Sequence, residues 1–190
     1  MKNVSGTERI FKWWIVSEKY AFFLDRDGVL NYSGKRPPNC PDELRLIAGV
    51  GWAIKRLNEL GFYVFVVTNQ GGVGLGYMSA ADLEAIHSKL KAEIAQAGGY
   101  IDDIMACTHA PHSGCKCRKP QPGMILALAK KHGIDLNGSY TVGDRWMDIA
   151  AGKNAGTKTI FIGEPSQVPD KVDLVSSSLA AAVATLFGSQ

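Results

Sequence analysis

The sequence predicts an α/β fold, a three-layer, doubly wound and mainly parallel sheet covered by helices on both faces. Short apolar runs alternate along the chain with segments whose apolar residues recur at helical spacing. The apolar residues of each run are consecutive, which is typical of strands buried on both faces. Polar and glycine-rich stretches follow several of these runs, at the sheet edge where such folds bind ligands.

The first half of the chain supplies two of the expected strands and two helices. Residues 20–24 (YAFFL) and 63–67 (YVFVV) predict buried strands. Residues 47–60 between them have helical spacing and end before Gly61, a residue typical of helix ends. A second helix is expected after Ser79, a favourable first cap. Its apolar stripe consists of Leu83, Ile86, Leu90 and Ile94.

The second half continues the alternation of strands and helices. Three more strands are expected over residues 101–107, 140–142 and 159–162. Helices are expected over residues 122–132, 148–155 and about 178–187, the first of which begins at a proline. We expect residues 20–190 to form one domain and residues 1–19 to form an N-terminal extension. Only residues 31–46 remain between the first strand and the first helix, too few for a separate cap domain.

The composition excludes several classes of protein. The chain has 190 residues, 46% of them hydrophobic and 21% charged, so it can bury a core without disulfides. A net charge of +3 with interspersed signs argues against a nucleic-acid surface. No apolar run approaches the roughly 20 residues of a membrane span. Residues 11–24 carry charges and no small-residue cleavage site follows them, so we expect a cytoplasmic protein without signal peptide or anchor.

Residues able to bind a metal and a phosphate stand at the ends of the expected strands. Asp25 and Asp27 follow the first strand, Thr68 follows the second, and Asp144 follows the strand that begins at Tyr140. Carboxylates from separate strands suit Mg²⁺, whereas a hydroxyl, backbone N–H groups and a lysine suit phosphate oxygens. Together they indicate phosphoryl transfer. Taken singly, the aspartates could instead be turn residues or helix caps.

Other binding classes fit the motifs less well. GVLNYSGKR resembles a phosphate-binding P-loop, but five residues separate its glycines and Arg36 replaces the required serine or threonine. GGVGLG lacks the G-x-G-x-x-G spacing of a dinucleotide site. A zinc-stabilised binding protein without catalysis is a further alternative, which the intact aspartates argue against.

A cluster of cysteines and histidine indicates a metal site. Cys107, His109, Cys115 and Cys117 offer three thiolates and an imidazole within eleven residues, a set suited to tetrahedral Zn²⁺. Because all four ligands would come from the protein, the site should be structural. His112 is an alternative ligand, and a free or disulfide-linked cluster is the alternative to zinc.

The motifs and their order resemble those of the haloacid-dehalogenase-like phosphatases. DRDGV after one strand, TNQ after the next, a downstream lysine and GDxxxD are similar to the four motifs of that superfamily. FLDRDGVLN, VVTNQGGVGLG, CTHAPHSGCKCRKPQPGM and YTVGDRWMDIAAGKNAGT resemble one branch of it, which contains heptose-bisphosphate and histidinol-phosphate phosphatases. The resemblance covers about residues 21–162 and implies a Rossmann-like phosphatase fold. It also supports zinc, with His109 rather than His112 as the ligand.

The residues and the resemblance together imply a mechanism. Asp25 is the expected nucleophile and Asp27 the general acid and base. The resemblance implies that Mg²⁺ is held by the Asp25 carboxylate, the Asp27 backbone carbonyl and Asp144. It further implies that the transferring phosphoryl group is held by Thr68, the Asn69 backbone and Lys119.

The substrate implied by the resemblance is a small sugar phosphate. Removal of the 7-phosphate of D-glycero-D-manno-heptose 1,7-bisphosphate is the favoured reaction, with histidinol phosphate or another small phosphate ester as the alternative. Arg118 and Arg145 are candidates for gripping the rest of the substrate. Asp148 is expected to orient Lys119 or cap a helix, with direct metal binding as the alternative, and Arg26 is expected to be structural or to lie at the rim. We expect a monomer with no nucleic-acid or membrane partner.

Overall fold

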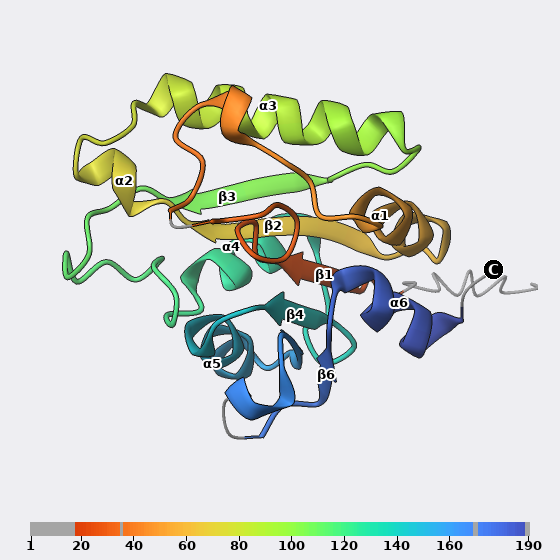
Figure 1. Cartoon of the computed structure of the whole chain (residues 1–190). Helices are drawn as coiled ribbons and strands as arrows, with labels where there is room; N and C mark the ends of the chain where they lie inside the picture. The colour runs from red at the N-terminus through yellow and green to blue at the C-terminus, as the bar shows by residue number, and fades with distance from the viewer. Residues whose placement is uncertain (1–17, 35, 169–170, 189–190) are drawn as a thin grey trace, which may run out of the picture.

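The computed structural model describes residues 18–34, 36–168 and 171–188. Six strands form one sheet, in the order β3-β2-β1-β4-β5-β6 from the top of Figure 1 to the bottom. Every neighbouring pair is parallel, which confirms the predicted fold class. The strands are β1 (Ala21–Leu24), β2 (Tyr63–Asn69), β3 (Asp103–Cys107), β4 (Tyr140–Gly143), β5 (Lys158–Ile162) and β6 (Leu174–Ser176). Trp13 and Trp14 of the expected extension lie outside the described residues.

Helices cover both faces of this sheet. They are α1 (Val50–Glu59), α2 (Gly71–Gly74), α3 (Ala80–Gln96), α4 (Gly123–His132), α5 (Trp146–Ala155) and α6 (Leu179–Phe187). Buried side chains of α1, α3 and α6 form one hydrophobic cluster with the sheet, and those of α4 and α5 join a second. The protein therefore has three layers, with a core on each side of the sheet.

Strand β1 shows how the sequence produces two cores. All four of its residues are fully buried. Phe22 and Leu24 belong to the cluster with α1, α3 and α6, whereas Ala21 and Phe23 belong to the other. Because successive side chains of a strand point to opposite faces, both faces of this central strand are buried, which its uninterrupted apolar sequence allows.

Several boundaries differ from the sequence-based expectation. Helix α1 begins at Val50 rather than at residue 47, and α5 begins at Trp146 rather than at Asp148. The backbone N–H of Arg145 donates to Asp148 Oδ2 at 3.0 Å, so Asp148 caps α5 from within its first turn. Strand β6 was not expected. It has three half-buried residues at the sheet edge, too short a run to show a period.

The loop between β1 and α1 contains no cap domain in its described part. Residues 31–34 and 36–49 hold only a 3-10 helix at Pro41–Glu43 and two isolated bridges. The carboxyl ends of β1, β2 and β4 therefore remain open on this side, as expected. No helix among the described residues combines the length and apolarity required to cross a bilayer.

Candidate active site

The chain turns tightly after β1 and carries Asp25 and Asp27 into the sheet edge. The N–H of Asp25 donates to the carbonyl of Val142 at 2.9 Å, which ties the first aspartate to β4. Gly28 has φ +91°, a conformation that favours glycine, and its N–H donates to the carbonyl of Asn31 at 2.8 Å. A Cβ at Gly28 would overlap the carboxylate of Asp144. The glycine thus lets the β1 turn and the β4 turn approach each other.

Lys119 is buried among acceptors at the centre of this edge. Its Nζ donates to Asp25 Oδ1 at 2.7 Å and to the carbonyl of Val67 at 2.8 Å, and lies 2.6 Å from Asp148 Oδ1. Burial favours loss of the lysine proton, but the carboxylates of Asp25 and Asp148 outweigh burial and raise the pKa of Lys119. The lysine is therefore a fixed positive charge. Its contact with Asp148, which also caps α5, confirms both expected roles of that aspartate.

Three carboxylates meet beside this lysine. One oxygen from each of Asp25, Asp144 and Asp148 lies within 4.8 Å of the others. The pKa of Asp25 is raised to about 6, chiefly by burial. The charge of Asp148 contributes to this rise, and the charge of Lys119 opposes it. Burial also raises the pKa of Asp144 to about 6, with a second contribution from Asp25. The ammonium group of Lys119 thus faces three carboxylates and cannot by itself balance their negative charge.

The donor set fits a divalent metal. Asp144 Oδ1 is buried and has no hydrogen-bond partner among the described residues, and the nearest recorded cation, Arg145 Nε, is 3.9 Å away. A buried carboxylate oxygen without a partner is costly unless a cation or a proton satisfies it. Oxygen ligands from separate strands match the preference of Mg²⁺. Asp25 and Asp144, both expected as ligands, are thereby brought together.

Thr68 and Asn69 end β2 at the same edge. Thr68 is buried, and its Oγ1 accepts from Gln70 Nε2 at 2.7 Å. The Asn69 side chain accepts from the Lys119 backbone N–H at 3.0 Å and donates to the Lys119 carbonyl at 3.1 Å. This pair of bonds fixes the segment that carries Lys119 to the end of β2. The side chain of Asn69 thus has a positioning role that the sequence did not indicate.

Asp27 is surrounded by donors whose role was not predicted. Arg26, Asn31 and Gln70 all donate to its carboxylate, at 2.8–3.2 Å. Arg26 is completely buried, so a rim position is wrong and a structural one is correct. From the sequence, Asn31 and Gln70 are plausible polar residues of the pocket without an assigned role, and Gln70 directly follows Thr68 and Asn69 in the TNQ motif.

A cationic pocket adjoins the carboxylates. The site itself is lined by residues that include Asp25, Asp27, Thr68, Lys119 and Arg145. Arg145 also lines a neighbouring pocket of about 260 Å³, together with Arg118, Tyr77 and other residues, none of them acidic. Arg36 lines it too, but its guanidinium is paired with Glu43. Arg118 Nη1 is buried with no hydrogen-bond partner among the described residues. This second pocket is suited to an anionic group.

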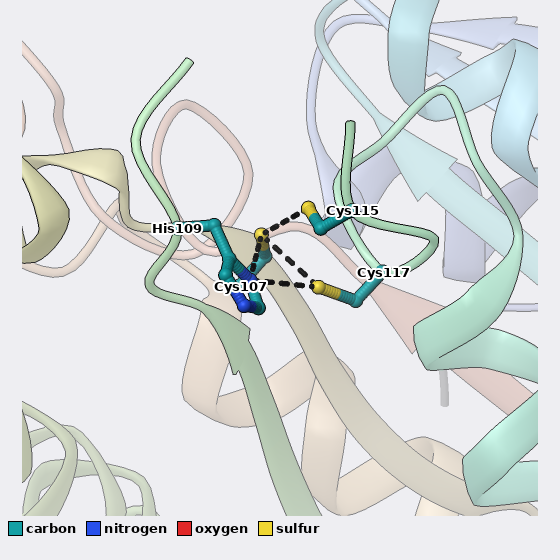
Figure 2. Close-up of side chains that lie close together, drawn as sticks. All are labelled: Cys107, His109, Cys115 and Cys117. Carbon is teal, nitrogen blue, oxygen red and sulfur yellow. Dashed lines mark hydrogen bonds between the residues drawn. The ribbon is translucent and has the colours of Figure 1, made fainter. Parts of the chain in front are cut away.

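The cysteines and the histidine predicted as zinc ligands come together beyond the end of β3. Figure 2 shows the side chains of Cys107, His109, Cys115 and Cys117 pointing toward one another. Cys107 Sγ lies 3.6 Å from Cys115 Sγ and 3.3 Å from Cys117 Sγ, and Cys117 Sγ lies 3.2 Å from His109 Nδ1. A Zn–S bond of about 2.3 Å gives tetrahedral edges of roughly 3.8 Å, close to this spacing. His112 is not part of the cluster, and all four cysteines of the chain are free.

Comparison with known proteins found one family model and many relatives. The model described as HAD-hydrolase-like matches residues 116–182. A D-glycero-beta-D-manno-heptose-1,7-bisphosphate 7-phosphatase of Pseudomonas putida is 41% identical over 139 residues, 73% of this chain and 79% of the relative. The enzyme of the same name from Rhodopseudomonas palustris is 40% identical over 173 residues, 85% of this chain and 93% of the relative.

A solved structure is also similar over almost its whole length. It is the crystal structure of the D,D-heptose 1,7-bisphosphate phosphatase of Bordetella bronchiseptica in complex with magnesium and phosphate. The TM-score is 0.81 at 36% sequence identity, and the alignment covers 88% of this chain and 97% of that one. Both the sheet and the expected metal are thus found in a relative.

Proposed function

The chain belongs to the heptose-1,7-bisphosphate 7-phosphatases of the haloacid-dehalogenase-like hydrolases, and we propose that it is a Mg²⁺-dependent phosphatase of that specificity. The reaction hydrolyses the 7-phosphate of D-glycero-D-manno-heptose 1,7-bisphosphate and yields heptose 1-phosphate and inorganic phosphate. The observation that supports it most directly is the Asp25 carboxylate, buried between Lys119 and two further carboxylates at the open edge of the sheet.

Asp25 is the proposed nucleophile. Its carboxylate attacks phosphorus, the bond between phosphorus and the C7 oxygen breaks, and an aspartyl-phosphate forms. Lys119, 2.7 Å from Asp25 Oδ1, holds this carboxylate in one orientation and offsets its charge. Water then attacks the phosphorus and releases phosphate and the free carboxylate. Splitting the hydrolysis into two displacements makes each step easier than direct attack by water.

Asp27 is the proposed acid and base of these two steps. In the first step it donates a proton to the departing C7 oxygen, and in the second it takes a proton from the attacking water. It lines the same pocket as Asp25 and follows it by two residues on the turn after β1. This proximity supports the assignment.

Mg²⁺ would be held by the Asp25 carboxylate, the Asp27 backbone carbonyl and Asp144. The unpartnered oxygen of Asp144 and the magnesium of the Bordetella structure support this assignment. When bound, the ion neutralises charge on the phosphoryl group and orients it toward the nucleophile. Thr68, the Asn69 backbone and Lys119 are the proposed donors to the transferring phosphoryl oxygens.

Arg118 and Arg145 are proposed to bind the far end of the substrate. They line the cationic pocket beside the carboxylates, and Arg118 Nη1 is a buried donor with no hydrogen-bond partner among the described residues. A bisphosphate carries a second anion at the distance of a sugar from the first. Guanidinium groups are suited to it because their paired donors match phosphate oxygens.

Zn²⁺ is the proposed occupant of the cysteine and histidine cluster. With four protein ligands it would be structural, as in closed zinc sites generally. Cys117 directly precedes Arg118 and Lys119, so the metal would fix the segment that carries two proposed substrate contacts. Cysteines that bind a metal rather than form disulfides are typical of a cytosolic protein, which supports a cytoplasmic enzyme. We further propose that residues 20–190 act as a single domain in a monomer.

A substrate panel tests the proposed specificity. It contains both anomers of the heptose bisphosphate, histidinol phosphate and a simple alkyl phosphate, each assayed for phosphate release with Mg²⁺. We expect kcat/KM to be at least about 100-fold higher for a heptose bisphosphate than for the other esters. The β anomer should be preferred, since the curated relatives above are named for it. Comparable rates on all esters would reject a dedicated heptose enzyme.

A further inference from the structure

Arg26 is among the largest completely buried side chains of the described protein, and it faces Asp27. Its Nε donates to Asp27 Oδ1 at 3.2 Å, and its Nη2 donates to Oδ1 at 3.1 Å and to Oδ2 at 3.0 Å. A guanidinium removed from water in this way is tolerated only when it is paired. The pairing joins adjacent residues, so it also restricts the turn on which both side chains stand.

Two amides complete the set of donors around Asp27. Asn31 Nδ2 donates to Oδ1 at 3.0 Å and Gln70 Nε2 donates to Oδ2 at 2.8 Å. Each amide is fixed in turn, Asn31 by the Tyr32 carbonyl at 3.0 Å and Gln70 by Thr68 Oγ1 at 2.7 Å. Both carboxylate oxygens of Asp27 are therefore oriented from two directions.

The turn itself is closed by the backbone of Arg26. Its carbonyl accepts from the N–H of Leu30 at 2.9 Å and from the N–H of Asn31 at 3.1 Å. The main chain of Arg26 thus closes the turn while its side chain orients the next residue. A lysine at this position could keep the charge but not the planar fork that contacts both oxygens.

The ring of His87, on α3, lies within electrostatic range of Arg26. His87 is buried, and burial lowers its pKa to about 4, with further lowering by the charges of Arg26 and Lys91 against an opposite effect of Asp27. The imidazole is therefore neutral at physiological pH. His87 Nε2 and Arg26 Nη1 are both buried with no hydrogen-bond partner among the described residues. Among the described residues, Asp27 is the only carboxylate in contact with the guanidinium of Arg26.

We propose that Arg26 is a positioning residue for catalysis, which holds the Asp27 carboxylate in the orientation required for proton transfer to the leaving oxygen and from water. This inference rests on the proposed role of Asp27 as acid and base. Arg26 is itself completely buried, so it acts through Asp27 and does not contact the substrate. Misplacing a catalytic group by about 1 Å can cost on the order of 10²-fold in rate, so such a residue can have a large effect.

The chemistry of the leaving group distinguishes positioning from simple structural support. The alkoxide of a sugar is a poor leaving group and needs a proton from Asp27. A 4-nitrophenolate is a good leaving group and departs with little help. A defect in Asp27 positioning should therefore slow the sugar ester far more than the aryl ester, whereas a general loss of active protein should slow both equally.

The first experiment compares Arg26→Lys with the unchanged enzyme on heptose bisphosphate and on 4-nitrophenyl phosphate. The measured quantity is kcat/KM, which reports the steps up to departure of the leaving group. We expect a loss of about 10²-fold on the sugar ester and of less than about 5-fold on the aryl ester. Equal losses on both esters would overturn the proposal. Arg56→Lys, on α1 and outside both pockets, is the matched control and should change neither value.

A double-mutant cycle gives a second readout with the sugar ester alone. If Arg26 acts only through the Asp27 carboxylate, Arg26→Lys should cause no further loss of kcat/KM in an Asp27→Asn background. Losses that multiply would contradict the proposal. Thermal unfolding of each variant checks that the fold is retained. Failure of either arm leaves the proposed function intact, whereas absence of phosphate release from the heptose bisphosphate by the unchanged enzyme would reject that function itself.

Discussion

The carboxylate site and the cysteine and histidine cluster are assembled in opposite ways. Asp25 and Asp144 come from distant parts of the chain and meet because the parallel strands β1 and β4 end at one sheet edge, which Lys119 reaches from the loop before α4. The cluster of Cys107, His109, Cys115 and Cys117 comes from a single segment of eleven residues. The first arrangement depends on the whole fold, whereas the second depends mainly on a local loop and on the metal it can bind.

The electrostatics of the two regions differ as well. The carboxylates are held by backbone contacts of the strand ends and by Lys119 from the loop before α4. They therefore stay close together, although burial and the charge of neighbouring carboxylates raise the pKa of Asp25 and of Asp144 to about 6. The residues of the cluster are exposed or half-buried apart from Cys107, and their recorded side-chain contacts are chiefly with one another. We therefore expect removal of Mg²⁺ to abolish activity without unfolding, and removal of Zn²⁺ to loosen the loop.

The largest effect is expected at Asp25. Asp25→Asn replaces the proposed nucleophile with a group of the same shape, and we expect phosphate release to fall by about 10³-fold or more. Because the buried Lys119 keeps Asp148 as an ion-pair partner in this variant, circular dichroism and zinc content should match those of the unchanged protein. Full turnover by the variant would refute the nucleophile assignment and, with it, the division of the protein into a reactive and a structural region.

A smaller loss is expected when the cluster is broken. Cys117→Ser removes one of four proposed ligands, so elemental analysis should show zinc well below one ion per chain. We expect activity to fall by about 10–100-fold, since the segment with Arg118 and Lys119 loses its anchor while Asp25 and Asp144 remain. Unchanged zinc content would contradict the ligand assignment. A loss as complete as that of Asp25→Asn would show that the two regions are not separable.

The same contrast explains how much could be predicted from the sequence. The cluster residues were identifiable because ligands so close in sequence show their spacing directly. The sheet edge was predictable because each candidate follows an apolar run or opens a helix. The contacts of Asp27 were not predictable, because Asn31 and Gln70 approach it from different loops. Only the tertiary structure shows which donors contact its carboxylate.

Buried charge and short elements were the main sources of error. Arg26 carries a charge within a polar motif, so its sequence gives no sign that it is completely buried against Asp27. Residues 174–176 form a strand only because they lie against β5 at the sheet edge. Helix α5 begins before Asp148 because the cap is provided from inside the first turn, a geometry that spacing alone does not reveal.

A moderate effect on stability is expected at Asp144. Its pKa rises from 3.8 in the unfolded chain to about 6 in the fold, so the folded state binds the proton more tightly. The resulting stability is present below about pH 4 and is lost as the pH rises through about 6. Because asparagine has no titratable carboxyl group, the Asp144→Asn variant does not lose this stability as the pH rises. Without metal, we expect its melting temperature at pH 7.5 to exceed that of the unchanged protein by about 6–12 °C, and the two to agree at pH 4.

Magnesium should reverse the order of these two proteins at neutral pH. The ion stabilises only the form that binds it, so addition of Mg²⁺ at pH 7.5 should raise the melting temperature of the unchanged protein and leave that of Asp144→Asn almost constant. Scanning calorimetry with and without Mg²⁺ measures the melting temperatures of both proteins. An equal response of the two proteins would remove Asp144 from the proposed ligand set.

The smallest effect is expected for a substitution of His112, which tests whether His109 or His112 is the zinc ligand. His112 has φ +65°, a left-handed conformation that asparagine also adopts, so His112→Asn should keep the local backbone. Because His109 Nδ1 faces the thiols and His112 is not part of the cluster, His112→Asn should retain zinc and full activity, whereas His109→Asn should lose both in part. If only the His112 variant lost zinc, His112 would be the fourth ligand and the assignment of His109 would be wrong. The proposed set of zinc ligands around Cys107 would then change. The assignment of the carboxylate site would stand, because that site shares no ligand with the loop.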